Sequence, residues 1–251
     1  MTLSRRAFLL GAPAAVLGAC AKAGGGRAAA PTPPSSATTA PAPSTTTRPG
    51  GRSAFVRRGP AAHPTVALTF HGSGDVALLD ELLAVAAAHR AKLTIFAVGQ
   101  WLDANPPVAR RILAGGHELA NHTYTHPALG RVSAEEARLE ASRCRDALVA
   151  HAGTPGRWFR PSGVEVPGDT ILGAAAAAGY PTVVGYDVDP HDYQDPGAAQ
   201  VRSRVSTGLA PGAIVSLHTG HRGTVDALGG ILDDAAAKGL RAVTVSELLG
   251  P

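Results

Sequence analysis

From about residue 64 onward, short apolar runs alternate with longer stretches of helical periodicity, and this alternation strongly limits the possible folds. The apolar runs are short, as expected of buried strands; they begin with TVALTF at 65–70 and include KLTIFAVG at 92–99, RWFRPSG at 157–163 and a final RAVTVSELL at 241–249. Helical patterns follow at 76–90, 106–115, 133–150, 169–178, 198–208 and 224–238, and Ser133 with Glu136 predicts a capping box at the start of the third. Seven or eight successive βα units predict an α/β fold, either a barrel or an open doubly wound sheet.

The first 20 residues have the pattern of a bacterial export signal. Arg5 and Arg6 precede an apolar run over 7–19, which is too short to span a bilayer and is typical of twin-arginine export. The run ends in VLGAC, where Cys20 occupies the position of the lipidated cysteine in a lipobox. Residues 1–20 are therefore predicted to be an export signal with a lipobox. An ordinary cleaved signal with a chance cysteine is the alternative.

Residues 21–53 lack the large apolar side chains that could offset the entropy of ordering, so we expect a Pro/Ser/Thr/Ala-rich tether. Residues 54–251 are expected to form a single, monomeric domain, anchored as a lipoprotein on the outer face of the cytoplasmic membrane. Residues 1–58 hold eight Lys and Arg and no acids, which leaves 15 basic and 19 acidic residues in the rest of the chain. The basic overall pI is therefore no argument for nucleic-acid binding.

Histidine chemistry is favoured by composition, because all ten histidines lie beyond residue 59. Outside the lipobox the only thiol is Cys144, which excludes an intramolecular disulfide and a cysteine-rich metal site. In barrels and open sheets, ligands bind at the carboxyl ends of the strands. Polar and aromatic residues follow the predicted strands there: His71, Asp75, Trp101, His122, His126, Arg160, Asp187, Asp189, Asp192 and His218.

Three of these positions point to specific chemistry. His122 and His126 can turn both rings toward one point if the residues between them form a helical turn, which would supply most of a zinc site; two exposed loop histidines are the alternative. His218 ends an apolar strand, and a neighbouring carboxylate would suit it to general acid catalysis, whereas a core histidine is the alternative. Arg160, held extended before Pro161, could bind a catalytic carboxylate or an anion, or form a surface ion pair.

In combination, these motifs resemble the polysaccharide deacetylases, the NodB-homology family of carbohydrate esterases. HTYTH resembles the family's metal motif, RPSG its third motif, DPHDY its D-x-x-D-W motif and IVSLH its closing L-x-H, in the family's order over 64–249. The resemblance implies a distorted (β/α)7-8 barrel that holds a divalent metal, most commonly zinc. It also implies a hydrolase that removes acetyl groups from a cell-wall or extracellular polysaccharide.

The same resemblance assigns roles to individual residues. His122 and His126 bind the metal, and His218 is the general acid. Asp189 tunes that histidine, and Arg160 orients the catalytic base. The residues expected to contact substrate are Tyr193, Pro161 and Trp101.

The family's first motif, T-F-D-D, is altered in this chain. Thr69 and Phe70 are present, but His71 and Gly72 replace the aspartates that serve as base and third metal ligand. In one arrangement, which we favour slightly, Asp75 is the third ligand and His71 is the base. In another, His71 completes a site of three neutral ligands that acidifies water to a pKa of about 7, and Asp75 is the base. A catalytically silent glycan-binding lipoprotein is the alternative function, and a lipoprotein that only captures metal is a weaker one.

Overall fold

The computed structural model describes residues 51–250. The predicted export signal, Cys20 and the predicted tether up to residue 50 lie outside the described residues. Within the described part of the chain, no helix is both long enough and apolar enough to cross a membrane. Ser53 is buried, and its hydroxyl donates a hydrogen bond to the Tyr180 carbonyl. This contact places Ser53 within the folded domain, ahead of the predicted boundary at residue 54.

Parallel strands form the centre of the domain. Four of them lie side by side in the order β4 (Glu118–Asn121), β3 (Thr94–Ala97), β2 (Thr65–Gly72) and β6 (Ile214–His218). The short β7 (Arg241–Ala242) pairs with the start of β2, and β5 (Thr182–Val184) pairs with β1 (Ala54–Val56). Single bridges from Phe159 connect β4 to β5, and a bridge between Val188 and Val215 returns to β6. The sheet thus curves round as a distorted α/β barrel, which confirms the predicted fold class.

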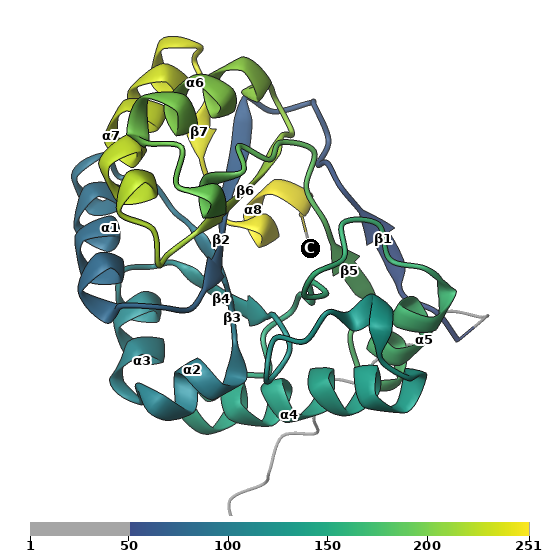
Figure 1. Cartoon of the computed structure of the whole chain (residues 1–251). Helices are drawn as coiled ribbons and strands as arrows, with labels where there is room; N and C mark the ends of the chain where they lie inside the picture. The colour runs from purple at the N-terminus through teal and green to yellow at the C-terminus, as the bar shows by residue number, and fades with distance from the viewer. Residues whose placement is uncertain (1–50, 251) are drawn as a thin grey trace, which may run out of the picture. The chain divides into compact units, whose positions relative to one another are not determined.

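Helices surround the strands (Figure 1). In chain order they are α1 (Val76–Ala88), α2 (Gly99–Ala104), α3 (Pro107–Ala114), α4 (Ala134–Ala152), α5 (Asp169–Ala177), α6 (Ala198–Gly208) and α7 (Arg222–Ala237). The short α8 (Val245–Leu249) covers the amino end of the barrel, where its Ser246 N–H donates to the Glu118 carboxylate at the start of β4. Short 3-10 helices occupy Leu129–Arg131 and Asp192–Gln194. The opposite, carboxyl end of the strands is therefore the accessible one.

Three predicted elements differ from the structure. The apolar run at 92–99 yields a strand only to Ala97, and α2 begins at Gly99. The stretch at 157–163 contributes single-residue bridges at Phe159 rather than a full strand. The last predicted strand, at 241–249, is mostly α8. There Thr244 and the Glu247 side chain form a capping box, a helix start signal that outweighs the apolar run.

Strand β2 connects the core to the site. Its alternate residues Val66, Leu68 and Phe70 pack with the helices in the main hydrophobic cluster. Ala67 belongs to the separate cluster inside the barrel, and the two-residue period of a strand directs His71 to that same side. Since β2 ends at Gly72, His71 is its last inward residue. The parallel register sets it beside His218 of β6.

Candidate active site

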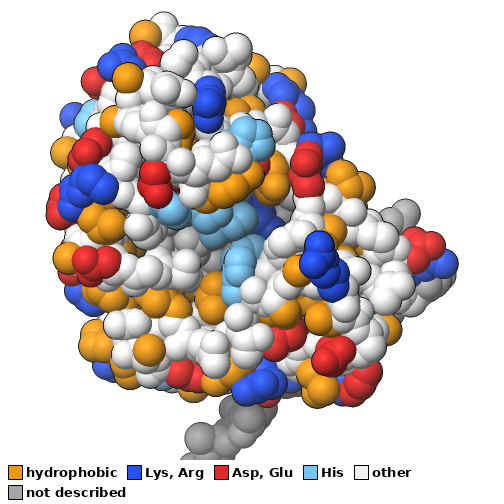
Figure 2. Space-filling model, in the orientation of Figure 1, with side chains coloured by type: hydrophobic (Ala, Val, Ile, Leu, Met, Phe, Trp, Pro, Cys, Tyr) orange, Lys and Arg blue, Asp and Glu red, His pale blue; other side chains and the backbone are white. Residues whose placement is uncertain are grey.

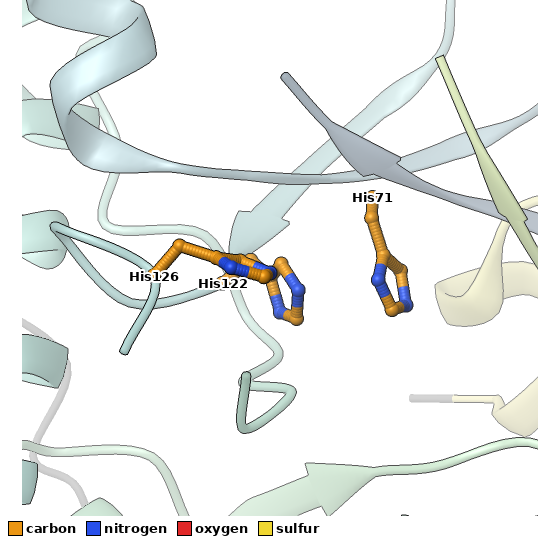
Figure 3. A group of neighbouring side chains, drawn as sticks. All are labelled: His71, His122 and His126. Atoms are coloured by element: carbon orange, nitrogen blue, oxygen red, sulfur yellow. The ribbon is translucent and has the colours of Figure 1, made fainter. Parts of the chain in front are cut away.

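Three histidines meet at the carboxyl end of the barrel (Figure 3). His71 comes from β2, whereas His122 and His126 come from the loop after β4. Each offers one ring nitrogen, and these nitrogens all lie within 4.8 Å of one another. The loop between His122 and His126 forms a bend rather than the helical turn that the spacing predicted. Thr123 and His126 have φ of 69° and 61°, and this left-handed backbone brings the second ring back to the first.

The protonation of His122 suits a metal ligand. The side chain is fully buried, and its Nδ1 lies 2.9 Å from the Arg160 carbonyl oxygen. A carbonyl can only accept, so Nδ1 carries the proton and Nε2 presents a lone pair. This Nε2 is buried and has no hydrogen-bond partner within residues 51–250. Burial, together with charge on the neighbouring His126, lowers the pKa of His122 well below its ordinary value. The ring is therefore neutral at pH 7.

His71 is held neutral by the same surroundings. Burial lowers its pKa well below the ordinary value, and positive charge on His122, His218 or Arg160 would lower it further. Its ring lies 4.2 Å from that of His122 and 4.4 Å from that of His218, measured between centroids. Three neutral imidazoles that leave an open position are a ligand set of catalytic zinc. The residues present thus fit a divalent metal.

Asp75 has neither of the roles proposed for it from the sequence. It is exposed and is the N-cap of α1, where its Oδ1 accepts a 2.9 Å hydrogen bond from the Ala77 N–H. Gly72 cannot be replaced by the family's aspartate without a shift of its neighbours. A Cβ at this position would lie 2.7 Å from Ile95 Cγ2 and 3.1 Å from Ala97 Cα. The cluster is therefore built from His71 on the opposite side of the strand.

The carboxylate partner of His218 is Asp192, and the prediction of Asp189 is wrong on this point. Asp192 Oδ1 lies 2.7 Å from His218 Nδ1, and its Oδ2 accepts 2.8 Å and 2.6 Å hydrogen bonds from the His218 N–H and the Thr224 hydroxyl. Asp192 is buried, so this pairing fixes Nδ1–H toward the carboxylate. The D-x-x-D-W motif held the signal for it, because Asp192 is the aspartate directly before the aromatic Tyr193.

A cleft of about 390 Å³ opens beside the cluster. Figure 2 shows histidine side chains gathered in this hollow. Tyr193 and Pro161, both predicted to contact substrate, line it, and the Tyr193 ring lies 5.5 Å from that of His218. Asp189 also lines the cleft and accepts a 2.8 Å hydrogen bond from the His191 N–H. Its carboxylate is thus close to the site although it does not pair with His218.

Trp101 differs from its predicted role as a substrate contact. It is 8% exposed and belongs to the main hydrophobic cluster. Its indole Nε1 donates a 2.9 Å hydrogen bond to the Gly74 carbonyl, and its ring packs near Gly72. Trp101 therefore supports the turn after β2 from behind, away from the cleft.

Arg160 is a buried cation beneath the cleft. Its Nε and Nη2 donate to the carbonyls of Val184 and Gly185 at 3.0 and 2.9 Å, and its Nη1 donates to Thr69 Oγ1 at 2.8 Å. Within residues 51–250 no carboxylate oxygen lies within 4.0 Å of the Arg160 guanidinium, so the predicted direct ion pair is not formed, although the charge of Asp189 acts on it. Burial lowers its pKa to about 9, which still leaves the group charged at neutral pH. Its charge favours a neutral His71.

Comparison with known proteins identifies the family. The polysaccharide deacetylase family model matches residues 58–183. A chitooligosaccharide deacetylase of Sinorhizobium fredii is 37% identical over 174 residues, which cover 66% of this chain and 76% of the relative. A peptidoglycan-N-acetylglucosamine deacetylase of Bacillus cereus is 30% identical over 199 residues, which cover 78% of this chain and 72% of the relative. The chain therefore belongs to the polysaccharide deacetylase family, a family of deacetylating enzymes, as its motifs predicted.

Solved structures agree with this assignment. A peptidoglycan N-acetylglucosamine deacetylase superposes with a TM-score of 0.74 at 29% identity, covering 78% of this chain and 93% of its own. A second similar structure, with a TM-score of 0.73 and 27% identity, covers 78% of this chain and 71% of its own. That protein, from Bacillus anthracis, is described as a pseudoenzyme of the CE4 family. The fold thus has both active and inactive relatives.

Proposed function

We propose that this protein is a metal-dependent deacetylase of an N-acetylated or O-acetylated polysaccharide, with His71, His122 and His126 as metal ligands. The observation that carries the proposal is the convergence of three ring nitrogens within 4.8 Å around the buried, unpartnered Nε2 of His122. A lone pair with no partner in the described residues is costly unless a ligand uses it. Three histidines with an open position favour zinc, although imidazole also suits other transition metals.

When bound, the ion would polarise the acetyl carbonyl and lower the pKa of water to about 7. Three neutral ligands leave the positive charge of such an ion uncompensated by the ligands themselves. This increases the acidity of water compared with a site that includes a carboxylate ligand. A more acidic water needs a weaker base, so the site can do without the aspartate base that the T-F-D-D motif places at position 71.

Asp189 is the residue we assign to accept the proton from water. It lines the cleft with His71 and His218, and its side chain is 22% exposed. Glu165 lines the same cleft, but it is exposed and paired with Arg57 at 2.6 Å. As the proton passes to Asp189, the water oxygen bonds to the acetyl carbon and the carbonyl π electron pair moves onto the carbonyl oxygen.

His218 is the residue we assign to the leaving amine. With Nδ1–H held by Asp192, its Nε2 is the nitrogen free to deliver a proton. That proton passes to the sugar nitrogen as the carbon–nitrogen bond breaks and the carbonyl bond re-forms, which releases acetate and a free amine. The Asp192 carboxylate stabilises the positive charge that His218 carries before the transfer.

The cleft supports a proposal for the substrate, and the N-terminal sequence supports one for the location. Tyr193 is 46% exposed at the edge of the cleft, where an aromatic face can stack on a sugar ring. The named relatives act on chitooligosaccharides or peptidoglycan, which supports an acetylated glycan. With the twin arginines and the lipobox at Cys20, we propose a monomer held by a lipid anchor on the outer face of the cytoplasmic membrane.

A catalytically silent glycan-binding lipoprotein is the second candidate. Two observations favour it: His71 and Gly72 remove both motif aspartates, and a structural relative of the same fold is a pseudoenzyme. The retained pairing of His218 with Asp192 in a buried hydrogen-bond network favours the enzyme.

Acetate release decides between the two. The purified chain, loaded with zinc, should release acetate from chitooligosaccharides or peptidoglycan, and His126→Ala should abolish this. His63→Ala is the matched control, because His63 is exposed and outside the cleft. A zinc-loaded chain that binds these glycans yet releases no acetate would establish the silent binding protein instead.

A further inference from the structure

The loop between His122 and His126 has a backbone that needs support. Thr123 and His126, neither of them glycine, have φ of 69° and 61°. Non-glycine residues in this left-handed region are strained and persist only where the surroundings hold them. The position of the His126 ring depends on that backbone. Whatever holds the loop therefore determines the geometry of the three nitrogens.

One buried carboxylate, Glu140 of α4, holds the middle of the loop. Its Oε2 accepts hydrogen bonds from the Tyr124 N–H at 2.8 Å and the Thr125 N–H at 2.7 Å. Its Oε1 accepts one from the Thr125 hydroxyl at 2.9 Å. Glu140 is 9% exposed, and within residues 51–250 it makes no ion pair. A buried carboxylate whose charge is met only by loop donors is costly without a compensating cation nearby.

The helix that carries Glu140 is itself fixed to β4. Asn121, the last residue of β4, donates from Nδ2 to the Ala141 carbonyl at 2.7 Å. The same side chain accepts a 2.9 Å hydrogen bond from the Thr123 N–H through Oδ1. The N–H groups of three successive loop residues thus end on Asn121 and Glu140. The loop has a rigid support on the side away from the cleft.

We propose that Glu140 is a positioning residue of the metal centre, which fixes the His122–His126 loop and places a buried negative charge behind three neutral ligands. This inference rests on the metal-binding part of the proposed function. Because no carboxylate belongs to the ligand set, Glu140 offsets the ion's charge from outside it. Its hydrogen bonds end on Tyr124 and Thr125, the two residues directly before the ligand His126.

The test is zinc affinity, measured by competition with a chelator on the full-length chain. Glu140→Gln keeps the size of the side chain but removes the charge and turns an amide N–H₂ group toward loop donors. We expect zinc affinity to fall about 10- to 100-fold, the range for residues that orient metal ligands. Glu135→Gln is the matched control on α4, because Glu135 is exposed and forms its ion pair with Arg138, also on α4. It should leave the affinity unchanged.

Cobalt substitution separates positioning from a general effect on folding. The visible spectrum of the cobalt-loaded chain should change in Glu140→Gln and remain that of the wild type in Glu135→Gln. If Glu140→Gln does not fold, Thr125→Ala takes its place, because it removes one donor and retains the carboxylate; it should weaken zinc binding several-fold. Wild-type zinc affinity in whichever of the two variants folds would overturn the inference.

Zinc binding by the wild type distinguishes an error in the role of Glu140 from an error in the proposed function. If the wild type binds zinc and releases acetate while Glu140→Gln binds zinc equally well, only the role of Glu140 is wrong. If the wild type binds no zinc at all, both proposals fail together.

Discussion

The two ends of β4 each carry a histidine, and the two histidines are in opposite situations. His117, just before the strand, accepts a 3.1 Å hydrogen bond from the Leu93 N–H through Nδ1. His122, just after it, presents a buried Nε2 without a partner in the described residues. Both rings are buried and both are neutral, so residue type and burial do not distinguish them. The difference is whether the structure uses the lone pair.

The two ends of the barrel also differ in how fully their polar groups are hydrogen-bonded. At the amino end, the Glu118 carboxylate accepts from Trp158 Nε1, Thr94 Oγ1 and the Ser246 N–H. At the carboxyl end, the buried Arg160 guanidinium donates its hydrogen bonds to uncharged oxygens, and His122 Nε2 has no partner within the described residues. A satisfied polar network rigidifies a fold, whereas a buried lone pair with no partner in the described residues marks a place for a ligand. We therefore expect the amino end to stabilise the fold and the carboxyl end to hold the functional site.

Replacing each of the two histidines by alanine, in separate variants, should give the largest difference in zinc affinity between the two ends. His122→Ala removes a ligand, and we expect zinc affinity to fall at least about 100-fold, more than for loss of an outer residue, with acetate release below detection. His117→Ala should lower the free energy of unfolding and leave zinc affinity unchanged. Chelator competition measures both. Equal losses of zinc affinity in the two variants would remove the distinction between the two ends.

Asp192→Asn tests the carboxyl end and leaves the three proposed metal ligands unchanged. The amide no longer stabilises the charged His218, so kcat should fall ~10²- to 10⁴-fold while zinc affinity stays that of the wild type. Asp195→Asn is the control, because Asp195 pairs with the neighbouring His221 but is exposed. A small effect of Asp192→Asn on kcat would argue against His218 as the proton donor.

Glu118→Gln tests the amino end. One of its oxygens becomes an N–H₂ group that faces donors, which leaves buried groups unsatisfied and should cost about 1–3 kcal/mol of unfolding free energy. Urea denaturation measures this loss. Zinc affinity and kcat/KM should not change, and a drop in either would show that the two ends are coupled.

Acid should weaken the amino end through His117. Burial, with the nearby charge of Lys92, lowers its pKa from the ordinary 6.5 to about 4. Between pH 6.5 and pH 4, His117 is protonated in the unfolded chain but neutral in the folded chain. The free energy of unfolding is therefore unaffected by His117 above pH 6.5 and decreases as the pH falls toward 4. Urea denaturation of the metal-free chain at pH 7 and pH 5 should show this, and His117→Gln should reduce the difference by on the order of 1 kcal/mol. A pH dependence identical to that of the wild type would contradict the assignment.

Much of the fold could be predicted because strand and helix periods are local. The α4 capping box of Ser133 and Glu136 is where the sequence placed it. Helix α8 was missed because an apolar run of that length fits either a strand or a short helix, and only the Thr244–Glu247 cap distinguishes them.

The site was predictable to the level of strand ends but not of individual contacts. His122, His126 and His218 lie where their motifs indicated. Which aspartate reaches His218 depends on the backbone after β5, where His191 has a φ of 53° and the chain turns so that Asp192 faces inward. Asp75 was misassigned because a flexible-looking GSG segment leads directly into α1, whose free N–H groups are its nearest partners.

The role of His71 is the central claim, and zinc affinity of two variants tests it most directly. His71→Ala should lose at least about 100-fold in zinc affinity because a ligand is gone. Asp75→Ala should bind zinc as the wild type does and lose only about 1 kcal/mol of stability from its helix cap. The opposite result, zinc lost in Asp75→Ala and retained in His71→Ala, would contradict the three-histidine centre.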